Sequence, residues 1–150
     1  MTGKTALVVG AGGGIGSAMV RVLRDEGEYD NVIGFSRSES SPVALDITSE
    51  ETIVAAADWI SAEGLKPDLV FVATGILHNG TTGPEKSLRD LDGDWLTENY
   101  RINAIGPALI AKHFLPLMNR REPAIFAALS ARVGSISDNR LGGWLVRISR

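Results

Sequence analysis

The chain has 150 residues, 44% of them hydrophobic, and a formal net charge of −3 at pH 7. Such a length and composition suit one globular domain, residues 1–150, and the acidic balance without a basic cluster argues against nucleic acid as the main partner. Because cysteine is absent, disulfides and thiol-based sites are excluded. No apolar run approaches a membrane span and no signal-like segment is present, so we expect a cytoplasmic protein that does not enter a membrane.

A glycine-rich turn between a strand and a helix is the most informative feature. The apolar run 6–9 predicts a buried strand, and the pattern over 15–26 predicts a helix that stops at Gly27. We expect this helix to bury an apolar stripe formed by Ile15, Ala18, Met19, Val22 and Leu23. A strand, a glycine turn and a helix in this order bring bare backbone N–H groups against a phosphate. The candidate cofactor-binding residues of the turn are Gly10, Gly12, Gly13, Gly14, Ile15 and Gly16.

The rest of the chain alternates between strand and helix patterns. Further strands are expected at 31–35, 43–45, 69–73 and 124–129, and further helices at about 48–64 and 95–118, with a long loop over 75–94. A capping box formed by Thr48 and Glu51 is expected to open the first of these helices. The alternation predicts an α/β fold, a doubly wound parallel sheet of about five strands in the order 3-2-1-4-5 (a Rossmann fold).

Two kinds of nucleotide fit the glycine turn. The spacing Gly10-x-Gly12-x-Gly14 also occurs in methyltransferases that bind S-adenosylmethionine. Both those sites and NAD sites usually need an acidic residue at the end of the second strand, to hold ribose hydroxyls. This chain has Ser36 and Arg37 there, and a guanidinium suits a 2′-phosphate. The residues favour NADP, with NAD as the nearer alternative and the methyl donor as the more distant one.

Two polar residues lie where the predicted fold gives them a use. Asn103 falls on the apolar stripe of helix 95–118, where its carboxamide needs hydrogen-bond partners. Pro107 has no N–H, so the carbonyl of Asn103 loses its helical bond; the plainer interpretation is a proline kink with a locally satisfied asparagine. Ser130 ends the last predicted strand, at the edge where such sheets bind ligands, although a surface hydroxyl remains the alternative.

Taken in order, these motifs resemble those of the short-chain dehydrogenase/reductase family. The resemblance rests on Asp46-Ile47, Ala73-Thr74-Gly75 and the stretch from Asn99 to Asn103, and residues 129–136 and 142–144 are most similar to the branch of C-factor and sniffer-type carbonyl reductases. It implies NADP-dependent hydride transfer with a small carbonyl or alcohol substrate, in a protein that is usually a homo-oligomer.

The resemblance also implies roles for individual residues. It implies that Asp46 and Ile47 contact the adenine and that Ala73, Thr74 and Gly75 form a turn beside the cofactor. It further implies that the carbonyl of Asn103 holds a water in a proton relay. Ser130 would hydrogen-bond the substrate carbonyl, with Ser135 as its rival.

The tyrosine and lysine on which the family's chemistry depends are missing. Neither of the two tyrosines, Tyr29 and Tyr100, has a lysine four residues on. We therefore expect a truncated or frameshifted reading of a longer reductase gene, with a divergent tail at 145–150, the last part of the family fold missing and the last strand left as an open edge. A non-catalytic dinucleotide-binding fragment is the alternative. No metal is expected, because the aspartates at 90–94 lack the glutamate that a calcium loop requires.

Overall fold

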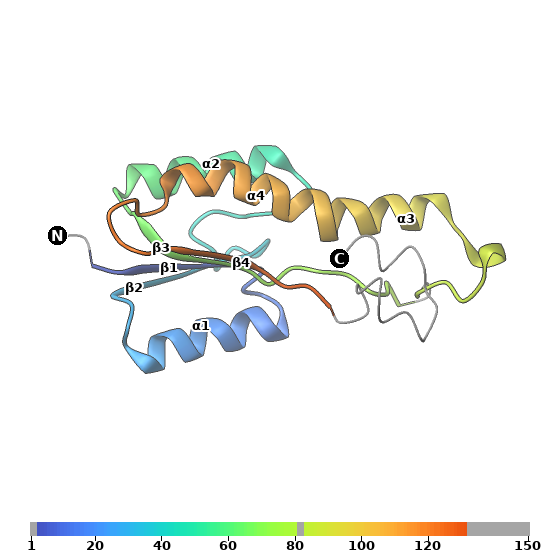
Figure 1. Cartoon of the computed structure of the whole chain (residues 1–150), viewed down its shortest axis with the longest axis horizontal. Coiled ribbons are helices and arrows are strands. Elements are labelled where there is room, and N and C mark those ends of the chain that lie inside the picture. Colours follow the sequence, from blue (N-terminus) through green and yellow to red (C-terminus); the bar gives the residue numbers. More distant parts are fainter. Residues whose placement is uncertain (1–2, 81–82, 132–150) are drawn as a thin grey trace.

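The computed structural model describes residues 3–80 and 83–131, which form a parallel sheet with helices on both faces. Figure 1 shows α1 on one face of the sheet and α2 with α4 on the other, while α3 extends past the carboxyl ends of the strands. The strands are β1 (Thr5–Val9), β2 (Asn31–Phe35), β3 (Pro67–Val72) and β4 (Ile125–Ala128), in the spatial order β2-β1-β3-β4. The doubly wound α/β class is thereby confirmed, as is the predicted order of these four strands.

Helical segments connect the strands. They are α1 (Gly14–Glu26), α2 (Glu50–Ala62), the 3₁₀ turn η1 (Leu88–Asp90), α3 (Gly93–Tyr100), the π-helical η2 (Arg101–Ile105), α4 (Gly106–Phe114) and the 3₁₀ turn η3 (Leu115–Leu117). The predicted helix over 95–118 is therefore a run of four helical segments of three kinds. Over the described residues 75–80 and 83–94 the predicted loop is confirmed, with η1 and the first turn of α3 near its end.

The centre of the sheet explains why β1 is apolar throughout. All five residues of β1 are fully buried, because helices cover both faces of this central strand. Leu7 and Val9 belong to the core on the side of α2 and α4, whereas Ala6 and Val8 belong to the smaller core under α1. Burial of β1 up to Val9 therefore fixes the position at which the following turn begins.

The predicted strand at 43–45 is wrong. One backbone hydrogen bond joins the segment to the end of β2, from the N–H of Leu45 to the carbonyl of Ser36 at 2.8 Å. Leu45 is nevertheless buried in the larger core. The segment 43–45 is therefore apolar because the side chain of Leu45 is buried in the core, and not because the segment pairs with a strand.

The predicted capping box at the start of α2 is also wrong. The N-cap is Ser49, and its side chain makes no capping hydrogen bond. The hydroxyl of Thr48 instead donates to Asp46 Oδ1 at 2.7 Å. The Thr48 side chain therefore bonds a residue two positions before it in the chain and does not cap the helix.

The buried face of α1 agrees with the predicted stripe at Met19 and Leu23 but not at Ile15 and Val22. Ile15 is 60% exposed and Val22 is 45% exposed. The face that contacts the sheet contains the buried Gly16 and Leu23 and the half-buried Met19 and Val20, of which Gly16 and Val20 are not part of the predicted stripe. A Cβ at Gly16 would overlap the carbonyl oxygen of Gly10. The backbone of α1 therefore lies directly against the glycine turn at Gly16.

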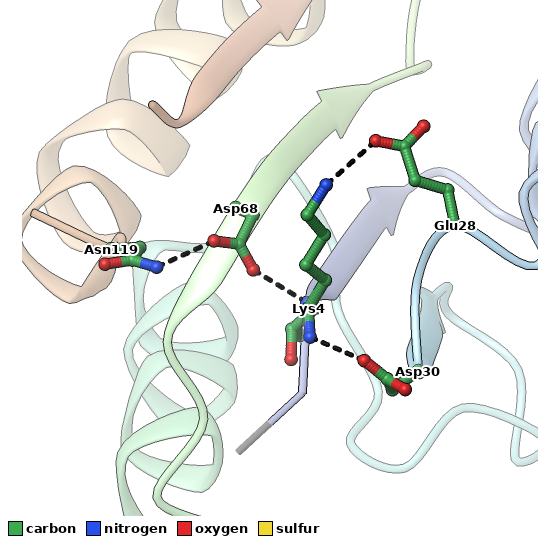
Figure 2. Close-up of polar contacts among 6 residues, drawn as sticks. Lys4, Glu28, Asp30, Asp68 and Asn119 are labelled. Carbon is green, nitrogen blue, oxygen red and sulfur yellow. Dashed lines mark hydrogen bonds and ion pairs between the residues drawn. The ribbon is translucent and has the colours of Figure 1, made fainter. Parts of the chain in front are cut away.

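A group of polar contacts holds the amino-terminal edge of the sheet (Figure 2). The carboxylate of Asp68 accepts from the N–H of Thr5 and from the side chain of Asn119, both at 2.8 Å. The N–H of Lys4 donates to Asp30 at 2.8 Å. These side chains are used in holding the strands together at this edge, which leaves the carboxyl edge for a ligand.

Candidate functional site

The glycine turn after β1 is shaped by its own backbone. Gly10 has φ +90°, a conformation that favours glycine. The N–H groups of Gly10 and Ala11 donate to the carbonyl of Phe35 at 2.9 and 3.0 Å, and the N–H of Gly13 donates to the carbonyl of Gly10 at 3.0 Å. The turn is therefore tied to the end of β2, with no side chain of its own covering it at Gly10, Gly12 or Gly13.

The N-terminus of α1 is open to an anion. Its N-cap is Gly13, which has no side chain to cap the helix, and the first turn contains no acidic residue. The first N–H groups of a helix have no partner within the helix, and the helix dipole gives this end a partial positive charge. A phosphate bound at the turn would accept hydrogen bonds from these N–H groups and interact favourably with this partial positive charge.

A cavity of about 570 Å³ lies between the glycine turn, the end of β2, the segment 45–48 and the end of β3. The parallel strands change their direction of connection beside β1, which is where sheets of this kind form a ligand crevice. Ten predicted cofactor-binding residues line it: Gly10, Gly12, Gly13, Ser36, Arg37, Asp46, Ile47, Ala73, Thr74 and Gly75. The others, Gly14, Ile15 and Gly16, belong to the start of α1 and do not line the cavity.

Asp46 is held in its ionised form by Thr48. Its Oδ1 accepts from the hydroxyl of Thr48 at 2.7 Å and from the N–H of Thr48 at 2.9 Å. These bonds hold the pKa of Asp46 below its ordinary value, and the guanidinium groups of Arg37 and Arg101 act in the same direction. Asp46 therefore contributes a carboxylate to the cavity wall at neutral pH.

Hydroxyl groups collect beside Arg37 at the end of β2. The Oγ of Ser38 lies 2.8 Å from that of Ser36 and 2.7 Å from that of Ser40. Arg37 is exposed and lines the cavity together with Ser36 and Ser38. A guanidinium and several hydroxyls are groups that bind phosphate well.

Thr74 brings a polar atom without a partner to the cavity wall. Its Oγ1 is buried and makes no hydrogen bond in the structure, although buried hydroxyls nearly always have one. Its methyl group lies against Gly10, where an added Cβ would be 2.9 Å away. A ligand with a polar atom at this point would satisfy the hydroxyl.

Asn103 joins the long helix to the segment after β3. Its Oδ1 accepts from the N–H of Ile76 at 2.8 Å, and its Nδ2 donates to the carbonyl of Ile76 at 2.9 Å. The carboxamide thus finds the partners that its place on an apolar stripe required. The helix accommodates Pro107 through η2, whose last bond runs from the N–H of Gly106 to the carbonyl of Arg101. The water that Asn103 would hold stays a prediction.

Of the two candidate serines, only Ser130 belongs to the described residues. Ser130 follows the end of β4 and is exposed, and it is not among the residues that line the cavity. Ser135 lies outside the described residues, as do the segment 142–144 and the tail 145–150. The cavity wall also contains six residues that sequence reasoning did not assign to the site: Ser38, Leu45, Thr48, Ile76, Glu98 and Ile102. Only Thr48 had a signal, its place two residues after Asp46.

Comparison with known proteins places the chain in a family. The sequence model of a family described as enoyl-(acyl carrier protein) reductase matches residues 10–140. A 1-hydroxy-2-glutathionyl-2-methyl-3-butene dehydrogenase of Rhodococcus sp. (strain AD45) is 34% identical over 157 aligned positions, which cover 98% of this chain and 65% of that protein. The short-chain dehydrogenase srdF of Neurospora crassa is 28% identical, over 97% of this chain and 64% of that protein. The chain therefore spans a little under two thirds of the length of these relatives.

Solved structures agree with the fold. A Burkholderia multivorans protein, named as a short-chain dehydrogenase/reductase and solved with bound NADP, has a TM-score of 0.83 at 27% identity, over 98% of this chain and 67% of that one. The carbonyl reductase Sniffer of Caenorhabditis elegans has a TM-score of 0.81, over 99% of this chain and 74% of that one; at 19% identity it shows the fold alone. In the part of the chain that the structure describes, no helix has the length and apolar character needed to cross a membrane.

Proposed function

The chain belongs to the short-chain dehydrogenase/reductase family, and from this premise we propose that it binds NADP in the cavity at the carboxyl edge of its sheet. The observation that carries the proposal is the meeting of the glycine turn, Asp46 and Arg37 around one cavity of about 570 Å³. The activity we propose for the whole protein is hydride transfer between NADPH and a small carbonyl or alcohol compound. The bound NADP of the Burkholderia multivorans relative supports the choice of ligand.

The residues of the cavity fit the parts of a dinucleotide. The N–H groups at the start of α1 would hold the pyrophosphate, and Asp46 with Ile47 would contact the adenine. Ser36 and Arg37 would bind the 2′-phosphate that distinguishes NADP from NAD. The hydroxyl of Thr74, buried and unpaired, would gain a partner. When bound, the nicotinamide supplies or accepts the hydride.

The remaining candidate residues would serve the substrate side. The carbonyl of Asn103 would hold a water for proton transfer, and Ser130 or Ser135 would hydrogen-bond the substrate carbonyl. Without a Tyr-x-x-x-Lys motif, however, the 150 residues contain no group of the family's kind to give or take the proton. We therefore expect this polypeptide to bind the cofactor without turning over a substrate. A cytoplasmic location and assembly with further copies are also expectations at this point.

A non-catalytic dinucleotide-binding fragment is the second candidate function, because the 150 residues contain no Tyr-x-x-x-Lys motif. Titration of the chain with NADPH, NADH and S-adenosylmethionine, followed by nicotinamide fluorescence or calorimetry, tests the site. A parallel assay measures NADPH oxidation with aldehydes and ketones. Binding of NADPH in preference to NADH, without oxidation, is the expected result. Turnover would contradict the non-catalytic assignment, and failure to bind either dinucleotide would contradict the proposed site.

A further inference from the structure

One wall of the cavity is a segment that no sheet ladder supports. Ile47 and Thr48 line the cavity, and the last backbone bond from this segment to β2 is made at Leu45. The same two residues also line a second hollow of about 540 Å³, together with Tyr100, Ile105 and others. Two hollows therefore border Ile47 and Thr48. The neighbouring Asp46 is tied to α2, because the hydroxyl of Thr52 accepts from its N–H at 3.0 Å and donates to its carbonyl at 2.9 Å. The position of the Thr48 carbonyl depends on a further contact.

Arg101 provides such a contact from a distant part of the chain. It is the first residue of η2, and its Nε and Nη2 both donate to the carbonyl of Thr48, at 3.2 and 2.8 Å. The two residues are 53 positions apart. A charged fork that donates two hydrogen bonds to one oxygen fixes direction as well as distance.

The backbone of the same helix reinforces this contact. A Cβ at Gly106, the first residue of α4, would overlap the side chain of Ile47 and come within 3.0 Å of its carbonyl oxygen. The helix therefore lies directly against the wall at Ile47. The bonds from Thr48 are the main cause of the lowered pKa of Asp46, and the guanidinium of Arg101 acts weakly in the same direction.

The opposite wall is held from the same segment of helix. Asn103, two residues after Arg101, pairs with both backbone groups of Ile76. The π-helical segment η2 thus contacts both sides of the cavity, Thr48 through Arg101 and Ile76 through Asn103. We propose that Arg101 is a positioning residue for the adenosine side of the cofactor site, which it holds through the carbonyl of Thr48. This inference rests on the proposed function only for the identity of the ligand.

Amide hydrogen exchange of the ligand-free chain tests the positioning itself. In Arg101→Ala, the amide of Thr48, which is bonded to Asp46, should exchange about tenfold faster, while the amide of Ile76 keeps its rate. Arg120→Ala is the matched control, because Arg120 is exposed and follows Asn119, which contacts the amino-terminal edge of the sheet. Unchanged exchange at Thr48 in Arg101→Ala, or equal acceleration in Arg120→Ala, would overturn the inference.

Binding of the two halves of the dinucleotide tests its effect on the site. Arg101→Ala should weaken binding of adenosine 2′,5′-bisphosphate about five- to tenfold and leave nicotinamide mononucleotide unaffected. Arg101→Lys keeps the charge but lacks the fork, so it should recover only part of the loss. Full recovery by lysine, or equal weakening of both halves, would overturn the inference. Thermal unfolding of each variant checks that the chain still folds.

The two proposals can fail separately. If the wild-type chain binds no dinucleotide, the proposed function fails, and the exchange rates at Thr48 still decide whether Arg101 holds the wall. If the wild-type chain binds NADPH and Arg101→Ala binds adenosine 2′,5′-bisphosphate equally well, the role of Arg101 fails and the proposed function stands.

Discussion

Arg37 is the residue on which the choice between NADP and NAD should depend. It is exposed, it lines the cavity beside Ser36, and its charge reaches Asp46. Arg37→Ala should raise the dissociation constant of NADPH about tenfold or more, because a charge-assisted contact with the 2′-phosphate is lost. The dissociation constant of NADH should change little. Fluorescence titration with both nucleotides measures the ratio.

Salt and a second arginine separate a specific contact from general attraction. The effect of Arg37→Ala should shrink at high ionic strength, since the site is open to solvent. Arg89, which is exposed on η1 and does not line the cavity, gives the control variant Arg89→Ala. Equal weakening of NADPH and NADH binding in Arg37→Ala would exclude a 2′-phosphate contact.

Asp46 should make the stability of the chain depend on pH in the acid range. The pKa of Asp46 is lowered in the folded chain, chiefly by the hydroxyl of Thr48. A depressed carboxyl pKa stabilises the fold above the unfolded pKa, and this contribution disappears as the pH falls through the folded pKa, below about 3.9. The difference in unfolding free energy between the wild type and Asp46→Asn should therefore be present at neutral pH and vanish in acid.

The cause of that shift can be tested directly. Thr48→Val removes the hydroxyl but keeps the N–H and the carbonyl, and it should raise the pKa of Asp46 toward its ordinary value. Carbon NMR of the Asp46 carboxyl against pH measures this change. An unchanged pKa in Thr48→Val would assign the shift to the N–H of Thr48 or to the neighbouring arginines.

At the scale of elements, the packing of α1 on the glycine turn gives a matched pair of variants. A Cβ at Gly16 would overlap the carbonyl oxygen of Gly10, whereas a Cβ at Gly14 would have no atom within 4 Å. Gly16→Ala should lower the free energy of unfolding by about 3 kcal/mol, because backbone must move to make room. Gly14→Ala should change it by less than about 1 kcal/mol, and toward stability. Urea unfolding followed by circular dichroism measures both, and equal effects would contradict the close approach at Gly16.

The elements that the sequence predicts well are those whose pattern has a single physical cause. The run from Ala6 to Val9 is apolar because helices cover both faces of β1, and Ile53 and Ile60 of α2 repeat at helical spacing because they meet the same core. The segment 43–45 was wrongly predicted as a strand because its apolar pattern, which includes the buried Leu45, is like that of a short strand. Thr48 misled because its hydroxyl bonds Asp46 in place of capping a helix.

The candidate site likewise contains some features that the sequence reveals and others that it does not. The glycine turn could be found because its glycines are clustered between a strand pattern and a helix pattern, and Asp46 because Asp46-Ile47 resembles a motif of the family. The contact of Arg101 with Thr48 could not, because it joins a side chain to a backbone carbonyl 53 positions away. The π-helical form of η2 was equally hidden: Pro107 indicates that a helical bond is lost, but not how the helix accommodates the loss.

At the scale of the whole molecule, the edge of the sheet at the amino ends of its strands and the edge at their carboxyl ends have different roles. Figure 2 shows the amino-terminal edge held by Asp68, Asp30 and their partners, while the cavity lies at the carboxyl edge. The contacts at the amino-terminal edge fix the strands, and the loops at the other edge can then differ in sequence without loss of the fold. α3 extends beyond the carboxyl ends of the strands (Figure 1). Its Glu98 is among the residues that line the cavity.

The side of the sheet formed by β4 should govern the association of this polypeptide. In the described part of the chain, β4 pairs with β3 on one side only, and its Ile125 is 59% exposed. An exposed strand edge with an apolar side chain is a template for pairing with another chain, and lysine on such a strand opposes that pairing. Ile125→Lys should therefore slow aggregation, measured by light scattering on warming, with little change in the free energy of unfolding. Leu88→Lys is the control, because Leu88 is 80% exposed but lies on η1 and not on a strand. If Leu88→Lys slows aggregation equally, exposed apolar surface in general is the cause and not the edge of β4.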